Sequence, residues 1–130
     1  RKGFAAWYQR WYGVELNPNT EIQPLIGSKE GILHVTLAFV NPGEQVLVPN
    51  PGYPTYTSLS KILGAEVISY DLKEEDGWMP DFEALEKMDL NRVKLMWTNY
   101  PNMPTGANAT PELYERLVDF RTPQEYRHRE

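Results

Sequence analysis

The fold is decided by Gln45–Pro54, which reads QVLVPNPGYP. Its first four residues form a short, almost continuously apolar run, which is the pattern of a strand covered on both faces. Three prolines and a glycine then make a stiff loop, because proline fixes its own backbone angle. We expect a helix to follow as far as about Leu63, with Gly64 ending it. This stretch therefore predicts one strand–loop–helix step.

Outside this stretch, the chain keeps alternating between strands and helices. We expect strands at 21–26, 66–70 and 93–97, and helices at 28–40, 80–86 and 111–120. Such alternation predicts the α/β class with a mainly parallel sheet. The far end of the helix that begins at Ser28 is apolar on almost every side, so we expect it to be buried.

Five aromatic residues mark one face of a helix at the start of the chain. Their spacing is i, i+3, i+4, i+7 and i+8, and they are Phe4, Trp7, Tyr8, Trp11 and Tyr12. We expect this amphipathic helix, residues 1–13, to pack on the body of the domain, with a partner-facing or subunit-interface helix as the alternative. At the other end, residues 121–130 contain only Tyr126 as a large apolar group, and we expect a disordered tail.

The composition excludes several classes of function. A chain of 130 residues is long enough for one domain, and its net charge of −5 gives no electrostatic footprint for nucleic acid or anionic lipid. The absence of cysteine excludes disulfides and thiolate metal sites, and two histidines do not support a histidine-rich metal site. The longest apolar run is far too short to span a membrane. We therefore expect a cytoplasmic protein that binds no metal, nucleic acid or membrane.

Three unusual loops are expected to follow strands, at the carboxyl ends where open parallel sheets bind ligands. The first is Gly27–Ser28–Lys29, at the mouth of a helix. Free amides and the helix dipole at such a place favour a phosphate or carboxylate, to which Ser28 can add a hydroxyl and Lys29 a charge. Taken alone, Ser28 is more simply explained as a helix N-cap. The spacing of nucleotide-binding glycine loops is missing.

The other two loops are stiff and polar. In Asn50–Pro54, Tyr53 stands between Gly52 and a proline, where an aromatic ring can stack on a flat cofactor or pack on its own loop. The third loop, Asn99–Gly106, reads NYPNMPTG and contains two prolines. It is either a tight structural turn or the wall of a pocket.

Taken in order and spacing, these loops resemble the fold-type I aminotransferases that use pyridoxal phosphate. The resemblance is to the class I/II branch near the LL-diaminopimelate, alanine and aspartate aminotransferases. Besides the three loops it includes Asn41-Pro42-Gly43-Glu44 and Pro80-Asp81-Phe82-Glu83-Ala84-Leu85. It covers about residues 4–120, and it implies that residues 1–120 form part of the mainly parallel-sheet large domain, the domain that binds pyridoxal 5′-phosphate.

The resemblance also implies roles for single residues. Gly27, Ser28 and Lys29 would hold the cofactor phosphate, and Tyr53 would stack on the pyridine ring. In the third loop, Met103 stands where the family has an asparagine that bonds to the ring oxygen O3′. A thioether cannot donate a hydrogen bond, so Asn99 and Asn102 are the nearby candidates to replace it.

The lysine that forms the Schiff base with the cofactor would lie beyond this chain, so no catalytic residue is assigned. The implied function is transfer of an amino group between an amino acid and a 2-oxo acid, by a homodimer of which this chain is a fragment. A lyase or decarboxylase of the same fold, or a non-catalytic phosphate-binding or interaction module, is the alternative. With later strands missing, we expect 93–97 to expose an edge and 21–26 to have no strand to pair with.

Overall fold

The structure is a computed structural model and describes residues 1–121; the expectation for the tail falls almost wholly outside them. Its contacts group into two compact units, Arg1–Gly31 and Ile32–Glu130. Within the described residues, no helix is long and apolar enough to cross a membrane.

The N-terminal unit begins with the expected aromatic helix, α1 (Lys2–Tyr12). Gly13 ends it in the left-handed conformation, with φ of 67°, and its amide donates to the Gln9 carbonyl. No side chain of α1 is buried, and its five aromatic side chains are 40–63% exposed. Three of them touch one another, with the Trp7 ring 5.5 Å from Tyr8 and 5.4 Å from Tyr12. The helix is confirmed, while its packing on the rest of the domain stays a prediction.

The prediction of a strand at Glu21–Ile26 is wrong. This segment has no regular secondary structure; it follows a turn in which the Glu21 amide donates to the Asn17 carbonyl, and Ile26 is 99% exposed. A strand is held by hydrogen bonds to a neighbouring strand, and the described residues give this segment none.

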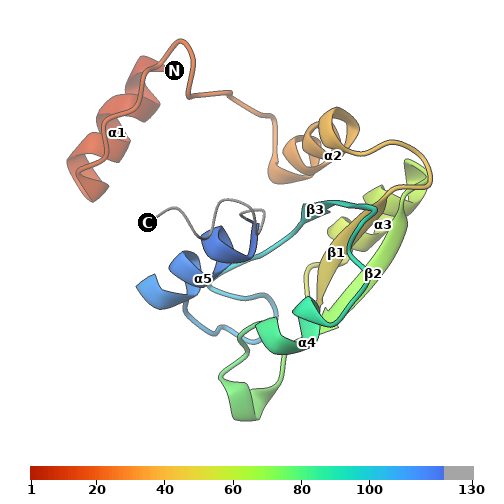
Figure 1. Cartoon of the computed structure of the whole chain (residues 1–130). Helices are drawn as coiled ribbons and strands as arrows, with labels where there is room; N and C mark the ends of the chain where they lie inside the picture. The colour runs from red at the N-terminus through yellow and green to blue at the C-terminus, as the bar shows by residue number, and fades with distance from the viewer. Residues whose placement is uncertain (122–130) are drawn as a thin grey trace, which may run out of the picture. The chain divides into compact units, whose positions relative to one another are not determined.

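The second unit is built on a parallel sheet formed by three of the four predicted strands, which confirms the α/β class (Figure 1). They are β1 (Gln45–Asn50), β2 (Glu66–Asp71) and β3 (Val93–Met96), in the order β2-β1-β3. Val46 aligns with Val67 on one side and with Leu95 on the other, after an irregularity in the β1–β3 register. Because β1 lies in the middle, its residues 46–49 are all buried.

Helices cover both faces of this sheet. On one face, Val46 and Val48 pack in a cluster with Ile32 and Val40, at and just after helix α2 (Ser28–Phe39), and Tyr56 of α3 (Pro54–Ile62). On the other, Leu47 packs in a cluster with side chains of α4 (Phe82–Glu86) and α5 (Pro111–Arg121). Figure 1 shows α3 and α5 on opposite sides of the strands. The alternation of buried side chains along β1 thus explains its continuous apolar sequence.

Two expectations for the helices need correction. Only Ile32 and Thr36 are buried on α2, whereas Leu37 and Phe39 are 56% and 63% exposed. The helix is apolar on several sides, but the described chain covers only one of them. The helix expected from Pro80 begins at Phe82, because Asp81 acts as the N-cap and accepts a hydrogen bond from the Ala84 amide at 3.0 Å.

Strand β3 is an edge strand among those described, as expected. Beside it lies a groove of about 670 Å³ whose lining includes Leu47, Val93, Leu95 and Phe120. The free edge of the sheet is therefore bordered by a largely apolar surface.

Candidate functional site

The first candidate loop lies in the N-terminal unit, where Ser28 is the first residue of α2. Gly27, Ser28 and Lys29 are all exposed. The first amides of a helix have no acceptor inside it, and no described residue accepts from the amides of these three. A pocket of about 420 Å³ within the unit is lined by Gly27 and Ser28 together with Phe4, Tyr8 and other side chains. The loop can thus offer several donors to an anion.

Neither a close contact nor the backbone conformation of the described chain requires glycine at position 27. A Cβ atom built there would meet nothing within 4 Å, and its φ angle is not in the left-handed region. Glycine is also used where a ligand approaches the backbone closely, which fits an open helix mouth. One acidic group already lies at this helix mouth and would compete with a bound anion for backbone amides. The Glu30 carboxylate accepts a hydrogen bond from the Ile26 amide at 2.7 Å.

The second candidate loop follows β1 and positions Tyr53, the residue before α3. Tyr53 is half-buried, and its ring meets that of Tyr56 edge-on at 5.7 Å. Tyr56 in turn stacks on Trp97 at 4.9 Å, with only 12° between the planes. Burial, followed by the neighbouring Tyr53, raises the pKa of the Tyr56 hydroxyl. The loop therefore presents a row of aromatic rings with Tyr53 at its end.

Gly52 is required for the shape of this loop. A Cβ atom built there would collide with the Pro49 carbonyl oxygen and lie 2.8 Å from Pro49 Cγ. Only glycine lets the chain turn back so closely on the end of β1, and this turn sets the position of Tyr53.

The third candidate loop follows β3 and holds its candidate residues at different depths. Asn102 is 3% exposed, Asn99 is half-buried, and the Met103 side chain is 52% exposed. The Asn99 side-chain oxygen accepts from the Met103 amide at 3.2 Å. Since β1 and β3 are parallel neighbours, this loop and the Tyr53 loop leave the sheet at the same edge.

The structure adds residues that the sequence had not singled out. Trp97 and Tyr56 extend the aromatic row from Tyr53, and Tyr70 donates from its hydroxyl to the Trp97 carbonyl at 2.7 Å. Burial raises the pKa of Tyr70 well above its ordinary value. The Y-x-x-Y spacing of Tyr53 and Tyr56, which places one tyrosine at the N-cap and the other in the first turn of α3, was the available signal.

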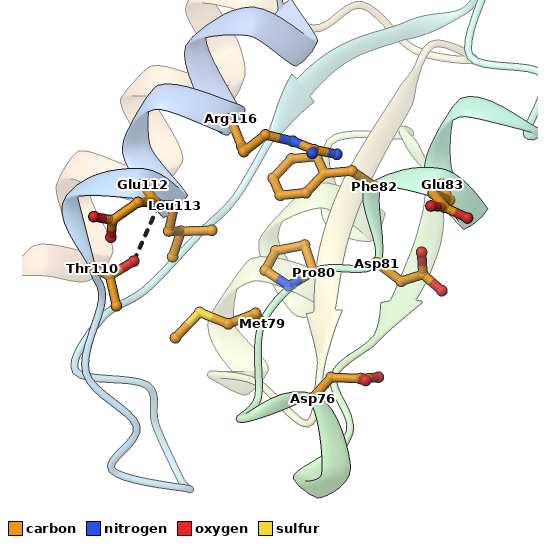
Figure 2. A pocket seen from close by; sticks show the side chains of 10 residues that line it. All are labelled: Asp76, Met79, Pro80, Asp81, Phe82, Glu83, Thr110, Glu112, Leu113 and Arg116. Atoms are coloured by element: carbon orange, nitrogen blue, oxygen red, sulfur yellow. Dashed lines mark hydrogen bonds between the residues drawn. The ribbon is translucent and has the colours of Figure 1, made fainter.

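A separate pocket of about 470 Å³ lies between residues 76–83 and the start of α5 (Figure 2). The Arg116 guanidinium stands 5.0 Å from the ring centre of Phe82, and the Thr110 hydroxyl accepts from the Leu113 amide at 3.3 Å. The hydrogen bond lies at the start of α5, and the Arg116 contact joins the middle of that helix to α4. None of the predicted site residues lines this pocket.

The parallel three-stranded sheet, with the Tyr53 loop and the Asn99–Gly106 loop after its strands, defines an α/β protein of the fold-type I pyridoxal-phosphate class. More particularly, the chain belongs to the aminotransferase class I and II family, whose model matches residues 1–125. That family depends on pyridoxal phosphate.

Similar proteins agree with this family. LL-diaminopimelate aminotransferases from Dehalococcoides mccartyi and Aquifex aeolicus are 47% and 48% identical over 120 residues. These matches cover 92% of this chain but only 31% of either relative, so the chain spans about a third of their length. A substrate-bound structure of BacF from Bacillus subtilis is 45% identical, with a TM-score of 0.84 over 92% of this chain and 30% of that one.

The residues present suit the two ends of pyridoxal phosphate, each within its own unit. An exposed helix mouth with free amides and a hydroxyl suits a phosphate, and an aromatic ring at a strand end suits a flat pyridine. Two buried donors in the second unit, Trp97 Nε1 and Asn102 Nδ2, have no acceptor among the described residues.

Proposed function

We propose that this chain is part of an aminotransferase that moves an amino group between an amino acid and a 2-oxo acid through pyridoxal 5′-phosphate. The observation that carries the proposal is the 47% identity to LL-diaminopimelate aminotransferase over 120 of the 130 residues, a length that must include all three loops. Those relatives are named for LL-diaminopimelate, which is a diamino dicarboxylic acid. An amino acid of this class is therefore the first substrate to test.

In this proposal, each loop has one task. Gly27, Ser28 and Lys29 bind the phosphate through amides, a hydroxyl and a charge. Tyr53 stacks on the ring, while Asn99, Asn102 and Met103 form the wall beside it. The cofactor supplies an electron sink when bound, and the lysine that would form the Schiff base with it is not in this chain. The isolated chain is therefore inactive, and the complete protein is a cytoplasmic homodimer.

A lyase or decarboxylase of the same fold would share all three loops, and a non-catalytic phosphate-binding fragment would need only the first. The aminotransferase names of the similar proteins favour amino-group transfer over elimination.

A direct titration shows whether this chain binds the cofactor at all. Adding pyridoxal 5′-phosphate should quench the fluorescence of the four tryptophans, and inorganic phosphate should compete. Absence of any saturable quenching would refute a cofactor site in this chain.

We expect Ser28→Ala to weaken the binding of pyridoxal 5′-phosphate by about 1 kcal/mol or more, the size of a hydrogen bond to a charged group. The loss should fall on phosphate-bearing ligands, so pyridoxal without phosphate is the matched probe. Ser58→Ala is the control, because Ser58 also lies in the first turns of a helix but its hydroxyl already donates to the Pro54 carbonyl at 3.0 Å. If Ser28→Ala weakens pyridoxal as much as its phosphate ester, Ser28 does not bind phosphate.

We expect Tyr53→Ala to lower the affinity for the cofactor by about 0.5–1.5 kcal/mol, the value of an aromatic stacking contact. Tyr53→Phe keeps the ring and should bind as the parent chain does. The same fluorescence titration measures both variants, with near-ultraviolet circular dichroism to check that Tyr56 and Trp97 keep their stacked arrangement. Equal affinity in the alanine and phenylalanine variants would show that the ring is not stacked on the ligand.

A further inference from the structure

Asn102 lies inside the third loop rather than on its surface. The residue is 3% exposed, and less than 1 Å² of its Nδ2 atom is accessible. Its backbone amide donates to the Ala107 carbonyl at 2.8 Å, and its carbonyl accepts from the Gly106 amide at 2.7 Å. The two ends of the segment from Asn102 to Ala107 are thus tied together at this one residue.

The side chain of Asn102 adds a second set of bonds through Thr105. The Thr105 hydroxyl donates to Asn102 Oδ1 at 2.8 Å and accepts from the Ala107 amide at 3.3 Å. The Thr105 amide also points to Oδ1, at 3.4 Å. These contacts fix the orientation of the side-chain amide, since exchanging its oxygen and nitrogen would set a donor against the Thr105 amide.

The neighbouring candidates face outward instead. Met103 is half-exposed, and Asn99 uses its side-chain oxygen for the Met103 amide. Its Nδ2 group donates to no described residue and is not buried, so it remains able to donate. A ligand approaching this loop would therefore meet Asn99 and Met103 before it met Asn102.

We propose that Asn102 is a positioning residue, which acts through Thr105 to hold residues 103–107 in shape and makes no contact with a bound ligand. The inference has a loop part, that Asn102 holds residues 103–107 in shape, and this part rests on the hydrogen bonds alone. Its ligand part, that Asn102 does not touch a bound ligand, rests on the proposed function. It revises the role that the family resemblance implied for Asn102, and it leaves Asn99 as the asparagine of the loop that can reach a ring.

Amide hydrogen exchange of the whole chain tests the loop part. Asn102→Ala and Thr105→Val should each speed exchange at Gly106 and Ala107 about tenfold, with no change at Val46 and Val48 in the core strand. Thr105→Ser keeps the hydroxyl and should exchange like the parent chain. The double variant Asn102→Ala/Thr105→Val should be no faster than either single one, because residues that act as one unit are not additive. Unchanged exchange, or effects that multiply, would overturn the proposal.

Titration with pyridoxal 5′-phosphate tests the ligand part. Asn102→Ala and Thr105→Val should weaken binding equally, by about fivefold, and Thr105→Ser should restore it. Weakening by Asn102→Ala alone, with Thr105→Val unaffected, would show direct contact with the ligand and overturn the proposal. If the parent chain binds no cofactor at all, the proposed function fails for this chain, while the exchange experiment still decides the role of Asn102.

Discussion

Replacing Leu47 with alanine is expected to destabilise the chain by about 3 kcal/mol. Leu47 is 1% exposed in the central strand, and its side chain belongs to the cluster formed with Tyr70, Leu72, Phe82 and Leu85. Removing a buried leucine side chain loses its transfer free energy and leaves a cavity, which together cost about 2–5 kcal/mol. Urea unfolding, followed by circular dichroism, measures the shift.

Leu37→Ala is the matched control for this prediction. It deletes the same atoms from a side chain that is 56% exposed, so the free energy of unfolding should change by no more than about 0.5 kcal/mol. Similar losses in the two variants would mean that the exposed face of α2 is covered in solution, and that the chain self-associates there. Sedimentation at two concentrations would then reveal the association.

The sheet could be predicted because its signals are local. The apolar run 45–48 and the glycines and prolines around it indicate a buried strand and its ends, and the observed strand extends it only to Asn50. The strand at 21–26 could not be excluded from the sequence, because whether such a segment forms a strand depends on a neighbour elsewhere in the chain. Its apolar residues fit a strand, but the folded segment has no regular secondary structure.

The candidate site was only partly predictable for a related reason. A family resemblance places Asn99, Asn102 and Met103 on one loop, but it does not say which side chains point inward. That choice depends on hydrogen bonds to Thr105 and to the backbone, which follow from the folded loop and not from residue types. The aromatic row beyond Tyr53 was missed because Trp97, just after β3, is far from Tyr53 and Tyr56 in the sequence.

Gly52→Ala is expected to cost about 1–3 kcal/mol of stability, the typical effect of forcing an extra methyl group into a packed site. The new Cβ would collide with the Pro49 carbonyl oxygen, which is backbone at the end of β1 and cannot turn away. To relieve the collision, the loop must move, and Tyr53 moves with it. Binding of pyridoxal 5′-phosphate should therefore fall at least as much as in Tyr53→Ala.

Gly27→Ala separates this effect from a general intolerance of alanine in the candidate loops. A Cβ at Gly27 meets nothing within 4 Å, and its backbone is not left-handed, so stability should stay within about 0.5 kcal/mol of the parent. If a phosphate approaches the backbone at this turn, the same methyl group should still weaken binding of the phosphate ester more than binding of pyridoxal. Gly52→Ala should instead weaken both ligands equally, because it displaces the residue proposed to stack on the ring. Equal unfolding midpoints for the two glycine variants would contradict the collision at Pro49.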